Sequence, residues 1–150
     1  MTPTNVVLDR LAELLATDAT TLAPAALAVH VHLAKAPFTP AGTRVVADFV
    51  EADFAGYAPL DAGVGPQQNF IDPSNGNRTV QLVEPPGGWH WQASGVGNLP
   101  QTIYGYYVSD NADAVLFGSK LIQPPIPLAG ILDGVDLAQV RFQLLTSGVI

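Results

Sequence analysis

The segment Thr102–Ser109 has the sequence TIYGYYVS, and the apolar run Ala114–Ile122 follows it across the turn Asp-Asn-Ala-Asp. Aromatic and β-branched residues, which are common in strands, dominate the first run. Two such runs, separated by a few turn-forming residues, predict consecutive strands. This region therefore favours a β fold for the chain.

Strand patterns continue on both sides of this region. Asn75-Gly76 is a hairpin signal between two of them, because both residues tolerate a positive φ. Gln123–Leu128 contains three prolines and cannot pair in a central strand, so we expect an edge strand or an extended crossover there. The other predicted strands are Leu27–Leu33, Gln67–Ile71, Arg78–Val83, Trp89–Ala93 and Val140–Thr146.

The N-terminal segment has a different pattern. Its apolar residues fall at helical spacing and predict a helix within residues 1–20, which either covers the chain's own sheet or docks on a neighbouring subunit. Residues 21–150 then form a single β domain. The predicted fold is mainly β, a small antiparallel β-sandwich or barrel with one N-terminal helix, and Val45–Val50 suits a short helical turn.

The composition limits what the chain can do. Charged residues make up 13% of its 150 residues, whereas a typical soluble domain has about 25%. We expect part of the weakly charged surface to be buried against other chains, since interface cores are depleted in charge. A net charge of -7 with scattered basic residues argues against nucleic acid as a partner. No membrane span or signal peptide is expected, and the absence of cysteine excludes disulfides.

Three histidines are the candidate metal ligands. His30 and His32 lie two residues apart on a predicted strand, so both side chains project from one face. His90, on another predicted strand, could complete a three-histidine site. Cupin-type barrels use such a His-any-His pair, but they follow it with a glutamate that is missing after His32. We therefore predict that the pair is the polar face of a strand, with no metal and no cofactor.

Two further groups could carry a function. Trp89 and Trp91 share one strand face and could stack on a sugar, although alternating aromatic residues are more often core or interface residues. Asp48, Glu51 and Asp53 lack a calcium-loop pattern and are expected to be a solvated acidic face. No catalytic motif is recognisable, so no catalytic residue and no enzymatic activity are predicted.

Three blocks of the sequence resemble a pattern in small proteins encoded among the structural genes of tailed bacteriophages. The blocks are Val29–Leu33, Phe38–Ala58 and Pro100–Val108, and together they make up about a quarter of the chain. The resemblance implies a virion component, such as a capsid decoration (cement) protein or a tail accessory.

We therefore expect a virion structural protein that stabilises capsomer junctions by burying apolar surface against the major capsid protein. It would form a homo-oligomer such as a trimer, with no nucleic-acid or membrane partner. The alternatives are a carbohydrate-binding β-sandwich of a phage tail and a cupin-like metal-dependent enzyme. The predicted interface residues are Leu8, Leu11, Leu15, Tyr104, Tyr106, Val149 and Ile150.

Overall fold

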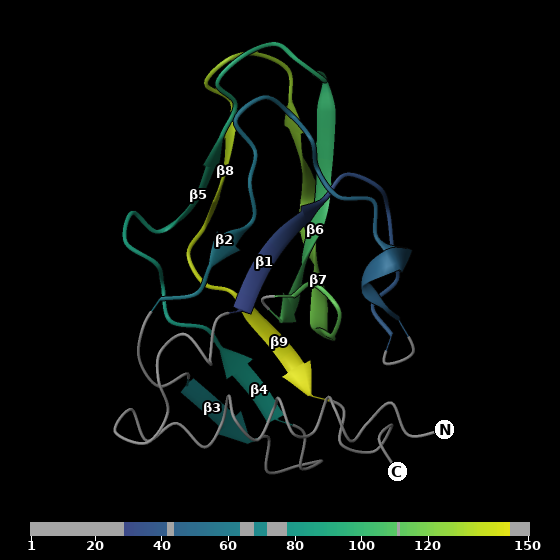
Figure 1. The fold of residues 1–150 in the computed structure, drawn as a ribbon, viewed down its shortest axis with the longest axis vertical. Coiled ribbons are helices and arrows are strands. Elements are labelled where there is room, and N and C mark those ends of the chain that lie inside the picture. Colours follow the sequence, from purple (N-terminus) through teal and green to yellow (C-terminus); the bar gives the residue numbers. More distant parts are fainter. Residues whose placement is uncertain (1–28, 42–43, 64–67, 72–77, 111, 145–150) are drawn as a thin grey trace.

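Figure 1 shows the computed structural model, which describes residues 29–41, 44–63, 68–71, 78–110 and 112–144. The predicted N-terminal helix lies outside the described residues. So do five of the predicted interface residues, which are Leu8, Leu11, Leu15, Val149 and Ile150. No helix in the described ranges is long and apolar enough to cross a membrane.

The described elements are nine strands and one 3-10 turn. They are β1 (Val29–Ala34), η2 (Val46–Asp48), β2 (Leu60–Asp61), β3 (Gln68–Ile71), β4 (Arg78–Gln81), β5 (Trp89–Gln92), β6 (Gln101–Asp110), β7 (Leu116–Leu128), β8 (Gly134–Leu137) and β9 (Arg141–Leu144). The strands form three antiparallel sheets, with the orders β2-β1-β6-β7, β3-β4-β9 and β5-β8. None of these sheets closes on itself in the described part of the chain, and the prediction of a mainly β antiparallel protein is confirmed.

The long β6–β7 hairpin is the largest paired unit, and it forms where the aromatic run and the apolar run were predicted to be strands. The proline-rich segment Gln123–Leu128 is the second half of β7, which is the edge strand of its sheet. An edge strand pairs on one side only, so prolines are tolerated there. Strands β2 and β8 were not predicted, because their two and four residues give too few alternating positions to be recognised.

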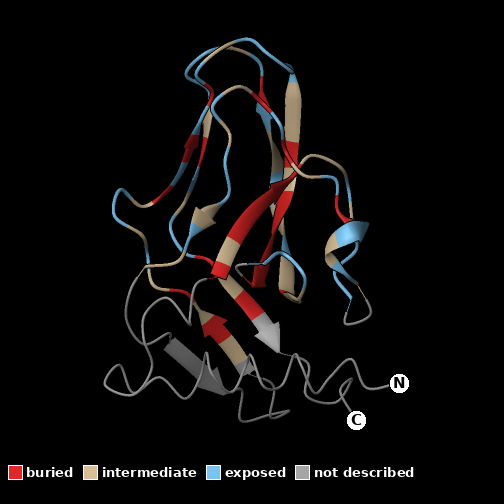
Figure 2. Ribbon diagram, in the orientation of Figure 1, coloured by how far each residue is buried: buried red, intermediate tan, exposed pale blue. Residues whose placement is uncertain are grey.

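One hydrophobic core joins all three sheets. Val31 and Val108 from the four-stranded sheet, Val80 from the second sheet, and Trp89 and Val135 from the third are all fully or almost fully buried in it. Figure 2 shows the buried stretches of the strands in red. Burial of large apolar side chains is the main stabilising contribution to such a fold.

The opposite face of β1 and β6 is covered as well. A segment that includes η2 folds over it and places Phe49 on the ring of Tyr107, with ring centroids 4.4 Å apart. Phe38, Val46 and Leu116 pack around this second, smaller apolar cluster. As a result, β1 has apolar neighbours on both faces, although its sequence alternates between apolar and polar residues.

The close approach of β6 and β7 gives a test of the fold. A Cβ atom at Gly105 would lie 2.4 Å from the Lys120 carbonyl oxygen on β7 and 2.6 Å from Cζ of Phe38. Because backbone must move to relieve this overlap, Gly105→Ala is expected to lower the free energy of unfolding by about 1–3 kcal/mol in urea titrations. The control is Gly130→Ala, where a Cβ would meet nothing within 4 Å. Equal stability of the two variants would contradict the described register.

Candidate functional site

Strand β1 presents His30 and His32 on its second face, next to the ring of Tyr107. The ring of His32 stacks on Tyr107 with centroids 4.6 Å apart, and the ring of His30 lies edge-on, 5.9 Å from that of His32. The His32 side chain is only 2% exposed, whereas that of His30 is 24% exposed. His30 thus lies on a half-exposed face as predicted, but His32 is buried, because Tyr107 stacks on its ring and Glu51, Ser109 and Asp113 contact its nitrogens.

Asp113 lies over both histidines. It comes from the turn between β6 and β7, where the Asp110 carboxylate accepts hydrogen bonds from the backbone of Ala114 and Val115. This turn holds Asp113 in the left-handed region, with φ of 55°. A single carboxylate oxygen, Oδ1 of Asp113, lies 2.8 Å from Nδ1 of His30 and 3.0 Å from Nε2 of His32.

A second carboxylate faces the far nitrogen of each histidine. Nδ1 of His32 lies 2.7 Å from Oε1 of Glu51, and Nε2 of His30 lies 3.0 Å from Oδ1 of Asp61. Asp61 is opposite His30 in the β1–β2 register, and Glu51 bridges to the end of β1. Each imidazole is therefore held between two carboxylates, one outer and one shared.

Tyr57 fixes the position of Glu51. Its hydroxyl donates to Oε1 of Glu51 over 2.9 Å and accepts from the backbone N–H of Leu33 over 3.0 Å. This hydroxyl replaces a strand partner for Leu33, because β2 pairs with β1 only as far as Val31. Burial raises the pKa of the Tyr57 hydroxyl, and the negative charge of Glu51 raises it further, so Tyr57 remains a hydrogen-bond donor.

Ser109 completes the cluster. Its hydroxyl lies 2.9 Å from Nε2 of His32 and 2.8 Å from Oδ1 of Asp113. Burial raises the pKa of the Asp113 carboxyl, but the hydrogen bonds from Ser109 and His30 and the nearby charges of both histidines outweigh that effect and lower it. Asp113 is therefore a carboxylate at neutral pH.

Ser109, His32 and Glu51 have the connectivity of a nucleophile, a base and an orienting acid. Ser109 is fully buried, however, and the Asp113 carboxylate lies directly beside its hydroxyl. A substrate carbonyl has no open approach to that oxygen, and the negative charge of Asp113 opposes a developing oxyanion. The geometry of these residues therefore disfavours nucleophilic catalysis by Ser109.

The structure places His90 elsewhere. His90 lies on β5, in a different sheet from β1, and its ring pairs with Asp136 on the neighbouring strand β8. Among the described residues, the group that could hold a metal ion consists of His30, His32 and Asp113. The third candidate ligand is thus Asp113, which sequence reasoning missed because it lies 81 residues from His32 in the chain.

The predicted acidic face separates into three roles. Glu51 contacts His32, Asp48 accepts a hydrogen bond from the Val45 backbone, and Asp53 pairs with Lys35 over 2.7 Å. Only Glu51 belongs to the histidine cluster, and no sequence pattern separated it from the other two.

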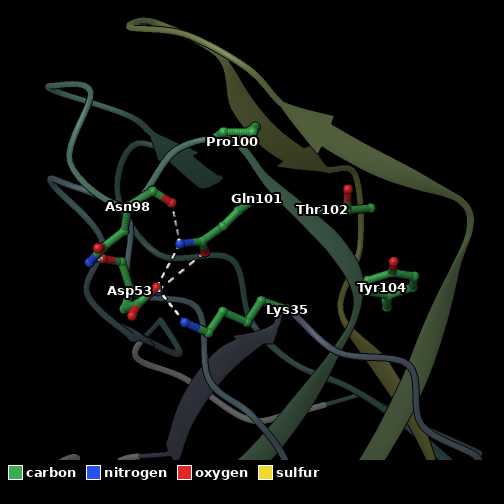
Figure 3. Close-up of a pocket in the computed structure, with 7 residues that line it drawn as sticks. All are labelled: Lys35, Asp53, Asn98, Pro100, Gln101, Thr102 and Tyr104. Atoms are coloured by element: carbon green, nitrogen blue, oxygen red, sulfur yellow. Dashed lines mark hydrogen bonds and ion pairs between the residues drawn. The ribbon is translucent and has the colours of Figure 1, made fainter.

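Asp53 lies in a polar depression of ≈ 510 Å³, whose lining also includes Tyr104 (Figure 3). Gln101 donates to Asp53, and Asn98 donates to the Asp53 carbonyl oxygen. The hydrogen bond from Lys35 lowers the pKa of Asp53. Lys35, Asp53, Asn98 and Gln101 are thus bonded to one another within this depression.

The predicted aromatic site residues lie mainly in the core. Trp89 and Trp91 are 2% and 3% exposed, and the Trp91 indole donates to the Ala58 carbonyl oxygen, so neither ring offers a free face to a sugar. Tyr106 is 3% exposed and its hydroxyl bonds to the backbone of Arg141, which leaves Tyr104 as the partly exposed member of that pair.

Comparison with protein-family models, with curated proteins and with solved structures gave no match.

The two hydrogen bonds of Tyr57 can be tested by a matched pair of substitutions. Tyr57→Phe leaves the buried Leu33 N–H without its acceptor and removes a donor from Glu51. We expect a loss of about 1–3 kcal/mol in the free energy of unfolding. Tyr104→Phe, which removes a hydroxyl with no hydrogen bond in the described ranges, should change stability by less than about 0.5 kcal/mol. Equal changes in the free energy of unfolding for the two variants would contradict a stabilising role of the Tyr57 hydroxyl.

Proposed function

We propose that this chain is a structural subunit of a larger particle, specifically a virion protein that decorates a capsid. The proposal combines the resemblance of three sequence blocks to phage structural proteins with an apolar surface at one end of the molecule. In this proposal the three sheets are parts of one β-sandwich, and the protein acts by burying surface against neighbouring subunits.

The apolar surface is formed by two adjacent loops and is called the apolar tip. It consists of Val96, in the loop between β5 and β6, and Ile131 and Leu132, in the loop between β7 and β8. These side chains are 69%, 54% and 69% exposed, respectively. Figure 1 shows both loops at the top of the molecule, and the Leu132 N–H joins them by donating to the Ala93 carbonyl oxygen.

The conformation of Leu132 is the observation that most strongly supports the proposal. Its φ of 74° lies in the left-handed region, which disfavours a side chain, and yet its side chain points into solvent. In an isolated molecule this exposed side chain gains no packing energy to offset the backbone strain. We therefore infer that it is buried in a contact with another subunit. Asp133 maintains the loop by accepting hydrogen bonds from Ala129 and Gly130, and these bonds lower the pKa of its carboxyl.

Multivalent attachment to a symmetric shell would make such a small apolar surface effective. A few apolar side chains give only weak attachment for one molecule. A symmetric oligomer, such as a trimer at a three-fold junction, presents several tips at once and multiplies the effective affinity. Tyr104 remains a candidate for the contacts between copies or with the major capsid protein.

The apolar tip can be tested with the double variant Leu132→Gly/Val96→Ser. Glycine relieves the left-handed strain, so the isolated protein should be as stable as the parent or more stable by up to about 1 kcal/mol. Co-sedimentation with shells assembled from the major capsid protein should fall at least tenfold.

The matched control is Val45→Ser, which changes a valine that is 54% exposed beside η2, away from the tip. This variant should co-sediment like the parent protein. A parent protein that does not bind shells, or a double variant that binds as well as the parent, would refute the proposal.

A further inference from the structure

We infer that His30, His32 and Asp113 form a binding site for a divalent transition-metal ion of the zinc type. Each residue offers one ligand atom, and these atoms lie within 4.8 Å of one another. Tetrahedral zinc with bonds of about 2.0–2.1 Å has ligand atoms about 3.3 Å apart. The distances from Oδ1 of Asp113 to Nδ1 of His30 and to Nε2 of His32, 2.8 Å and 3.0 Å, need only small adjustments to reach that value.

The outer carboxylates orient the histidines for such a site. Glu51 lies at Nδ1 of His32 and Asp61 at Nε2 of His30, so each ring can donate the N–H on its far side and point the lone pair of its other nitrogen at Asp113. Metal-bound histidines in proteins have this second contact almost without exception, because it fixes the tautomer and strengthens the ligand. Here both candidate histidines have it.

In that arrangement three electron-pair donors converge on one point. They are Nδ1 of His30, Nε2 of His32 and Oδ1 of Asp113, and the Ser109 hydroxyl supplies a single proton among them. Acceptors at such short distances repel one another unless a positive charge lies between them. A metal ion bound by all three atoms meets this requirement.

The ligand set selects the class of ion. Imidazole nitrogens with one carboxylate suit zinc and its neighbours among the transition metals, whereas calcium and magnesium require oxygen ligands. The site is buried on the side of His32, whose side chain is 2% exposed, and open to solvent on the side of Asp113, whose side chain is 45% exposed. The open side leaves room for water as a fourth ligand.

An ion at this position would connect β1 to the turn between β6 and β7. Its effect on the fold is therefore stabilisation, and the inference does not depend on the proposed role in a capsid. A metal that binds only the folded state raises stability in proportion to the logarithm of its concentration over its dissociation constant.

The experiment uses the full chain without a histidine tag, stripped with a chelator and dialysed at pH 7.5. Calorimetric titration with Zn²⁺ should give one site per chain with a dissociation constant below about 10 µM, and excess Zn²⁺ should raise the melting temperature. Co²⁺ should give the visible absorption bands of a four-coordinate ion with nitrogen and oxygen ligands.

The variants His30→Ala and Asp113→Asn should weaken Zn²⁺ binding at least 100-fold. Asp61→Asn, which changes only an outer carboxylate, should weaken it about 10–100-fold. The control is His90→Ala, because His90 is an exposed histidine with its own carboxylate partner on a different sheet, and this variant should bind like the parent. Circular dichroism of each variant separates loss of the site from loss of the fold.

A parent protein that binds no Zn²⁺ at 100 µM would overturn the inference and leave the cluster as a hydrogen-bonded network of histidines and carboxylates. Binding that is lost in His90→Ala but kept in His30→Ala would also overturn it, since the ion would then lie elsewhere.

Discussion

The buried imidazole of His32 is the constraint on which much of the structure depends. A polar ring in the interior is costly unless its nitrogens are bonded. Here Glu51 serves one nitrogen, and Asp113 and Ser109 serve the other. To bring these groups together, the segment after η2, the end of β6 and the following turn must all meet at β1, so one polar side chain fixes the positions of three separate stretches of chain.

The two faces of strand β1 have different roles in the fold. Its apolar residues fill the main core, while its histidine face is closed by Phe49 and Tyr107. The carboxylates of Glu51, Asp61 and Asp113 are placed around the histidines, where each makes a short contact. In a chain with 13% charged residues, three carboxylates thus surround the two histidines. The apolar tip lies at the end of the molecule where the β5–β6 and β7–β8 loops meet, and it contains Leu132 with a left-handed backbone conformation.

The strands were largely predictable because each is a local pattern. The β6–β7 hairpin, the pairing of β3 with β4 and the short turn η2 follow from residues that are near neighbours in sequence. The short strands β2 and β8 were missed, since two to four residues give no periodicity that can be distinguished from a loop. For the candidate site, the sequence supplied His30 and His32 as a pair on one face. It gave the wrong third partner for that pair, since His90 lies on another sheet beside Asp136.

By itself the sequence determined the mainly β class, the low charge, the lack of cysteine chemistry and the shared direction of two histidines, because these depend on composition and on the two-residue repeat of a strand. Only the tertiary structure decided that His32 is buried, that Asp113 and Ser109 reach it, and that Trp89, Trp91 and Tyr106 belong to the core. These facts depend on contacts between residues that are distant along the chain, and such contacts are set by how the sheets pack rather than by any local pattern. The same holds for the apolar tip. Its two loops are far apart in sequence, but they lie together because the strands that flank them end at the same end of the molecule.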